Sequence, residues 1–139
     1  MKILVIDGQG GGVGRSIVAA MKAAMPDQQL IALGTNVQAT AAMLKAGADM
    51  GATGEGAIRY QCKSADIILG VTGILHANAM LGEITPAIAA AVSLSEAQKI
   101  LVPLDRCGLI IAGVEKQPLE SLIRKAAEAA AALTTKNKP

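Results

Sequence analysis

The sequence predicts an α/β protein built as a three-layer sandwich, with a mostly parallel sheet and an antiparallel hairpin at the sheet margin. Apolar runs alternate along the chain with segments of helical periodicity, and a glycine-rich loop joins the first run to the first helix. Such alternation favours a parallel sheet with helices on both faces. The length of 139 residues and the hydrophobic content of 52% fit one folded domain.

Each element follows from a local pattern. Residues 2–6 are a continuous apolar run, which is typical of a parallel strand buried on both faces. Residues 15–25 carry apolar side chains at helical spacing, and Pro26 ends that helix. Further strands are expected at residues 30–33, 49–53, 66–71, 99–104 and 108–114, and further helices at residues 39–46, 56–63, 86–92 and 119–133.

The last two expected strands lie too close together for a crossover helix. Residues 99–104 and 108–114 should therefore pair as an antiparallel hairpin, near an edge because Pro103 cannot donate to a sheet ladder. We expect one domain over residues 1–133 and a polar C-terminal tail over residues 134–139.

Composition argues against two classes of partner. Tyr60 is the sole aromatic residue, so the chain offers almost no side chains that could stack on bases. The formal net charge is only +2, which is too small to predict binding to the phosphate backbone of a nucleic acid. No apolar run approaches the roughly 20 residues that span a bilayer, so no membrane partner is expected. Cys62 and Cys107 form no metal-binding pair, and free thiols without a recognisable signal peptide indicate the cytoplasm.

The strongest motif is the glycine-rich loop between the first strand and the first helix. Residues 8–14 contain five glycines, whereas a tight turn that binds nothing needs one or two. Glycines allow close approach of the backbone, and free N–H groups at a helix N-terminus favour an anion. The loop therefore predicts phosphate or nucleotide binding by Gly8, Gln9, Gly10, Gly11, Gly12, Val13, Gly14 and Arg15.

The spacing G-x-x-x-G-x-G at Gly8, Gly12 and Gly14 resembles the cofactor loop of the short-chain dehydrogenase/reductase family. That resemblance implies a Rossmann-like domain and NAD(P) as cofactor. The catalytic Tyr-x-x-x-Lys of that family is absent, because Tyr60 is followed by Ser64 at the required position. Residues 34–36, Gly-Thr-Asn, also lack the acid that usually binds the ribose of NAD.

A second resemblance lies in residues 11–16, which are similar to the phosphate loop of the deviant Walker-A ATPases. Arg15 replaces the lysine of that motif, and arginine is not equivalent to that point charge. The resemblance implies binding of a nucleoside triphosphate with magnesium. The acid of a Walker-B motif would then be Asp105.

A third resemblance covers most of the chain and rests on several motifs in order. The sequence resembles a family of small, single-domain bacterial proteins of unknown function with a Rossmann-like pattern, through residues 7–14, 32–36, 45–49, 51–55, 80–86 and 99–104. It implies a bacterial, cytoplasmic protein with that fold. It supplies neither a reaction nor catalytic residues.

Polar residues after the other strands complete the candidate site, because ligands of open α/β sheets bind at the carboxyl ends of the strands. The cofactor-binding candidates there are Thr35, Asn36, Thr72, Gly73 and Asn78. Glu55, His76, Asp105 and Arg106 belong to the same set of strand ends.

Each candidate also has a structural interpretation. Thr35 or Asn36 caps the following helix, Asp7 accepts bonds from the glycine loop, and Glu83 with Thr85 and Pro86 starts a helix.

The leading hypothesis is an uncharacterised nucleotide-binding protein that holds NAD(P) or another small phosphate-bearing ligand on the glycine loop. Two alternatives stay open, a non-enzymatic homodimeric interaction or regulatory module and a degenerate P-loop binder of nucleoside triphosphates. No catalytic set or metal cluster is visible in the sequence, so the pattern leaves open whether the protein is an enzyme.

Overall fold

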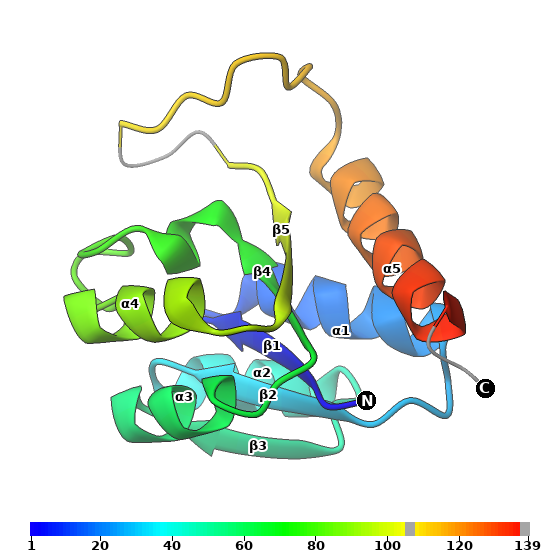
Figure 1. Ribbon diagram of the computed structural model, residues 1–139, viewed down its shortest axis with the longest axis horizontal. Coiled ribbons are helices and arrows are strands. Elements are labelled where there is room, and N and C mark those ends of the chain that lie inside the picture. Colours follow the sequence, from blue (N-terminus) through cyan, green and yellow to red (C-terminus); the bar gives the residue numbers. More distant parts are fainter. Residues whose placement is uncertain (105–107, 137–139) are drawn as a thin grey trace.

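The computed structural model describes residues 1–104 and 108–136, and Figure 1 shows their arrangement. Within this part of the chain, five parallel strands form one sheet in the order β3-β2-β1-β4-β5. The strands are β1 (Ile3–Asp7), β2 (Leu30–Gly34), β3 (Met50–Thr53), β4 (Ile67–Val71) and β5 (Gln98–Val102). The helices are α1 (Gly12–Ala24), α2 (Val37–Lys45), α3 (Glu55–Cys62), the short 3-10 helix η1 (Thr72–Leu75), α4 (Pro86–Leu94) and α5 (Leu119–Lys136).

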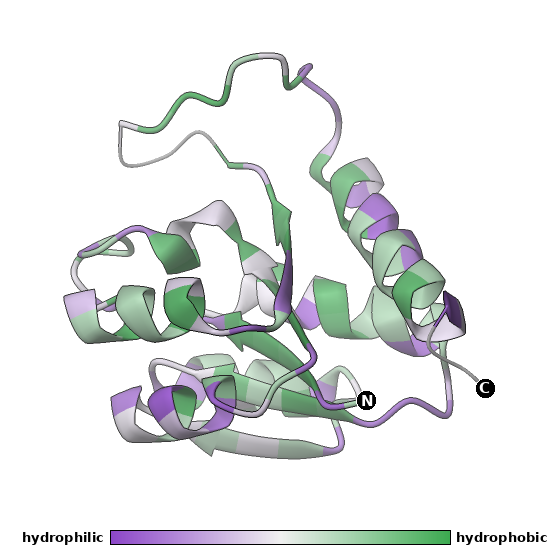
Figure 2. Cartoon of the chain, viewed as in Figure 1, coloured by the Kyte–Doolittle hydropathy of each residue, from purple (hydrophilic) through white to green (hydrophobic). Residues whose placement is uncertain are grey.

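Helices cover both faces of the sheet. Helix α1 packs beside α2 and α5, whereas α3 packs beside α4, as right-handed crossovers between parallel strands require (Figure 1). The five residues of β1 and of β4 are all buried, and Ile17, Val18 and Met21 of α1 pack into the same core. Figure 2 shows this hydrophobic centre, with hydrophilic segments mainly at the outside of the helices. The predicted Rossmann-like three-layer sandwich is therefore confirmed.

The predicted hairpin is wrong. Residues 108–118, which we call the strap, contain no strand and lead directly to α5 (Figure 1). Pro103 follows the end of β5 and lacks an N–H donor. Gly108 and Gly113 adopt left-handed φ values of 75° and 84°, which interrupt an extended run. The described sheet is therefore entirely parallel.

The last helix extends beyond its predicted end at residue 133. Helix α5 continues to Lys136, and the hydroxyls of Thr134 and Thr135 donate to the carbonyl of Ala131 at 2.8 and 3.0 Å. Such bonds to the preceding turn let threonine continue a helix. Residues 137–139 lie outside the described part of the chain.

The caps of two helices agree with the sequence patterns, whereas α1 begins at Gly12, before its predicted start at residue 15. Asn36 caps α2 by accepting from the Ala39 amide at 2.9 Å, and Thr85 caps α4 with Pro86 at its first turn. None of the described helices combines the length and the apolar character that a membrane crossing requires.

Candidate functional site

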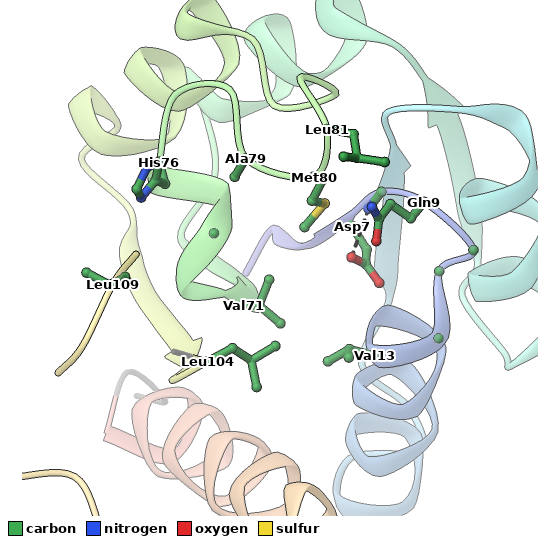
Figure 3. Close-up of a pocket in the computed structure, with 15 residues that line it drawn as sticks. Asp7, Gln9, Val13, Val71, His76, Ala79, Met80, Leu81, Leu104 and Leu109 are labelled. Carbon is green, nitrogen blue, oxygen red and sulfur yellow. Dashed lines mark hydrogen bonds between the residues drawn. The ribbon is translucent and has the colours of Figure 1, made fainter. Parts of the chain in front are cut away.

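A cavity of about 370 Å³ opens at the carboxyl ends of β1 and β4 (Figure 3). These two strands lie at the position where the strand order reverses, which is where ligands of open α/β sheets bind. One wall is the glycine loop, which contributes residues 7–13. The opposite wall belongs to residues 76–85, which we call the flap, and contributes His76, Ala79, Met80 and Leu81. Val71, Gly73, Leu104 and Leu109 complete the lining.

The carboxylate of Asp7 shapes the glycine loop from inside. It is buried at the end of β1, and its two oxygens accept from the amides of Gly8 at 2.8 Å and Gly14 at 2.7 Å. Burial raises the pKa of Asp7, the two amide bonds oppose that effect, and the nearby charge of Glu83 adds to the rise. Asp7 therefore has the structural role expected from the sequence, and it satisfies two amides of the loop.

Other amides of the loop remain free. The Gly11 amide donates to the Gly8 carbonyl at 2.9 Å, and the Arg15 amide donates to the Gly11 carbonyl at 2.9 Å. Among the described residues, the amides of Gly10, Gly12 and Val13 have no hydrogen-bond partner. Gly12 and Val13 are the first two residues of α1, where helical geometry leaves N–H groups unpaired. All three residues line the cavity.

Glu83 ties the flap to two other segments. Its Oε1 accepts from the Gln9 amide at 2.9 Å, the Thr35 hydroxyl at 2.6 Å and the Asn36 side-chain amide at 2.8 Å. The hydrogen bond from Thr35, with those from Gln9 and Asn36, holds the pKa of Glu83 below its usual value against partial burial. The glycine loop, the end of β2 and the flap thus meet at one ionised carboxylate.

Thr35 and Asn36 support the site from behind instead of lining it. The Thr35 hydroxyl donates to Glu83, whereas Asn36 caps α2 and donates to both Glu83 and the Gln9 carbonyl, the latter at 2.9 Å. Neither residue lines the cavity, so their ligand contacts stay a prediction.

Of the other residues predicted to bind the ligand, one lines the cavity and three do not. Gly73 lines the cavity, but the Thr72 hydroxyl is paired with the backbone of Leu104 at 3.1 and 3.2 Å. Asn78 is exposed and outside the lining, with a left-handed φ of 68°. Arg15 is exposed on α1 and does not line the cavity either.

Sequence reasoning missed the apolar part of the lining and the role of Glu83. In the sequence, Met80, Leu81, Leu104 and Leu109 have the character of ordinary core or loop residues. Only the folded chain brings them to the cavity that the glycine loop lines. In the sequence, Glu83 lies between Gly82 and the helix cap at Thr85, and this position predicts that it helps to start the helix. Thr85 performs that role, and its hydroxyl also donates to Glu55.

Metal-ligating side chains and thiols are the other features of the described residues that bear on the site. No group of three His, Cys, Asp or Glu side chains among them is arranged to bind a metal ion. Cys62 is buried, which raises the pKa of its thiol to about 11 and makes it inert near neutral pH. The candidates Asp105 and Arg106, and Cys107 beside them, lie outside the described residues.

The fold and this cavity define an α/β protein of Rossmann-like architecture with a glycine-rich loop after its first strand. The chain belongs to the family described as Domain of unknown function (DUF3842), whose model matches residues 2–135. The resemblance to an uncharacterised single-domain family is confirmed at that level. No curated protein matches this chain.

Proposed function

We propose that this protein binds a nucleotide, or a related phosphate-bearing ligand, in the cavity between the glycine loop and the flap. The observation that carries the proposal is the set of three unpaired amides, of Gly10, Gly12 and Val13, on residues that line the cavity. Unpaired amides at a helix N-terminus bind phosphate oxygens, and the helix dipole favours their negative charge.

The charges around the cavity favour a ligand with few negative charges. Its described lining contains no lysine or arginine, and the Asp7 carboxylate lies directly behind the loop. A nucleoside triphosphate would bring about four negative charges against three amides and one helix dipole. A diphosphate without a further phosphate, such as NAD or ADP-ribose, brings fewer, and the apolar side chains of Met80, Leu81 and Leu104 in the lining fit a base or a nicotinamide ring.

Calorimetric titration with NAD(H), NADP(H), ADP-ribose and magnesium-ATP tests the proposal. We expect saturable binding of at least one diphosphate ligand to the wild type and at least tenfold weaker binding to Gly12→Ala, whose new methyl group enters the lining. Gly56→Ala is the matched control, because Gly56 lies equally open at the start of α3 and outside the cavity. No binding of any ligand at millimolar concentration overturns the proposal.

A degenerate P-loop that binds nucleoside triphosphates is an alternative with less structural support. It needs Arg15 at the phosphate, and Arg15 points to solvent outside the lining. We therefore expect Arg15→Ala to change nucleotide affinity by less than twofold. A tenfold loss that appears only with magnesium-ATP would instead favour the P-loop.

A homodimeric module is a second candidate, and exposed apolar side chains favour it. Ile110 is 87% exposed, Val114 44% and Leu119 41%, and they border a groove of about 370 Å³ between the strap and α5. Figure 2 shows hydrophobic colour over the first part of the strap and hydrophilic colour shortly before α5. Sedimentation with and without nucleotide tests this candidate, since a dimer that forms without ligand supports it and a monomer at all concentrations refutes it. A bacterial, cytoplasmic setting stays the expectation from the sequence resemblance.

A further inference from the structure

We propose that Glu83 is a positioning residue, which fixes the flap and the glycine loop as the two opposing walls of the cavity. The inference rests on the proposed function insofar as the cavity receives a ligand. Its structural part, that one carboxylate couples the two walls, can be tested without any ligand.

The hydrogen bonds of the flap point to this role. Glu83 reaches 74 positions back along the chain to the Gln9 amide, and 48 and 47 positions back to Thr35 and Asn36. Among the described residues, no other hydrogen bond joins the flap to the glycine loop. The remaining polar contacts of the flap run within it, from His76 to the Gly73 carbonyl, into the start of α4, or from Thr85 to Glu55 on α3.

The backbone of the flap needs such an anchor. Asn78, Met80 and Leu81 all adopt left-handed φ values, of 68°, 57° and 58°, which residues with a Cβ atom rarely adopt. Leu81 is 97% exposed, so burial of its side chain does not stabilise this conformation. Residues 78–82 are instead held by the buried side chain of Ala79 within the segment, and by buried Ile84 and the bonds of Glu83 directly after it.

The glycine loop needs the same anchor. Five glycines within residues 8–14 give the free loop many backbone conformations, which a ligand would have to restrict on binding. Gln9 has a left-handed φ of 49°; its amide donates to Glu83, and its carbonyl accepts from Asn36, itself bound to Glu83. Because both the amide and the carbonyl of Gln9 are held, the part of the loop next to the free Gly10 amide is ordered before a ligand binds.

Packing at Gly8 shows how closely the walls meet. A Cβ atom at Gly8 would lie 2.7 Å from the Thr35 hydroxyl, 2.8 Å from the Met80 sulfur and 3.2 Å from Glu83 Oε1. The flap therefore touches the start of the glycine loop directly. Loss of the Glu83 bonds would release both walls together, because nothing else polar connects them in the described chain.

Amide hydrogen exchange of the ligand-free protein, measured by NMR, provides the test. We compare the wild type with Glu83→Ala, Glu83→Gln and the control Glu55→Gln, which alters a carboxylate that also accepts from a flap hydroxyl but does not reach the glycine loop. In Glu83→Ala we expect at least tenfold faster exchange at Gln9, Gly82 and Ile84, with β4 unchanged. Glu83→Gln should restore part of the protection, because its amide oxygen still accepts, and Glu55→Gln should leave Gln9 as in the wild type.

Two results overturn the inference. One is unchanged exchange at Gln9 and in the flap of Glu83→Ala, and the other is an equal acceleration throughout β4, which indicates a general structural role. Binding of ADP-ribose is measured on the same variants, where we expect at least tenfold weaker binding for Glu83→Ala and less than twofold change for Glu55→Gln. If the wild type binds no nucleotide, the proposed function fails while the exchange result still decides the role of Glu83.

Discussion

Substitution of two glycines in the same helical turn should separate stability from ligand binding. A Cβ atom at Gly14 would lie 2.7 Å from Asp7 Cβ, 2.8 Å from Asp7 Oδ2 and 2.8 Å from the Met43 sulfur. A Cβ atom at Gly12 would meet nothing within 4 Å. Gly14 thus lets α1 approach β1 closely, whereas Gly12 keeps the cavity open.

The expected magnitudes follow from these distances. Overpacking at Gly14 costs about 1–3 kcal/mol, and displacement of Asp7 weakens its bond to the Gly14 amide by about 1 kcal/mol. The higher helix propensity of alanine returns about 1 kcal/mol. We therefore expect Gly14→Ala to lower the free energy of unfolding by about 2 kcal/mol, from these terms together. Gly12→Ala should leave stability unchanged or raise it by up to about 1 kcal/mol.

Urea denaturation followed by circular dichroism measures the free energy of unfolding of both variants. In thermal unfolding, a difference of 1 kcal/mol corresponds to about 3 °C in Tm for a chain of this size. The ligand affinity of Gly12→Ala is measured beside its stability, since its methyl group enters the cavity lining. Equal stability of the two variants would refute the close approach of α1 to Asp7. A stable Gly12→Ala that binds nucleotide as well as the wild type would refute the assignment of the cavity.

Three further predictions concern titratable groups. Asp7→Ala leaves the buried amides of Gly8 and Gly14 without their acceptor, so we expect a loss of about 2–4 kcal/mol in urea unfolding, and a loss below 0.5 kcal/mol counts against the Asp7 contacts. Because the folded-state pKa of Glu83 is lowered, its contribution to stability is present above its unfolded pKa and disappears as the pH falls through the folded value. The raised pKa of Asp7 acts in the opposite direction, so its burial penalty is relieved on acidification. Glu83→Gln should therefore flatten the decline of unfolding free energy between about pH 5 and pH 3, and an identical decline in both proteins contradicts the ionised role of Glu83. Burial raises the pKa of the Cys62 thiol to about 11, so its peptide should stay unmodified by iodoacetamide at pH 8 until urea is added, whereas rapid modification in the native state, seen by mass spectrometry, contradicts that burial.

Local patterns in the sequence were sufficient for most of the fold. The apolar run of β1, the cap at Asn36 and the Thr85-Pro86 start of α4 each depend on neighbours in the chain, and the structure confirms them. The hairpin failed because an apolar run such as residues 108–114 satisfies a strand pattern even where glycines take left-handed φ values. Chain proximity excluded a crossover helix, but it did not require the two runs to pair.

The candidate site was predictable only in part, for a related reason. The glycine loop carries its signal in five glycines before a helix, and it does line a cavity. The partners of Asn36 and Glu83 lie tens of residues away, so their mutual hydrogen bond depends on the tertiary fold. The same holds for the apolar part of the lining, since Met80 and Leu104 line one cavity only after the sheet forms.

The central claim is that the free amides of the glycine loop receive the phosphate of a ligand. An NMR titration of labelled protein with ADP-ribose, in steps up to millimolar concentration, measures this at the atoms concerned. The account predicts large, saturable shifts of the Gly10, Gly12 and Val13 amide signals, with small shifts for Gly8 and Gly14, whose amides already donate to Asp7. Unchanged signals at all three free amides, or shifts confined to residues outside the cavity, would contradict it.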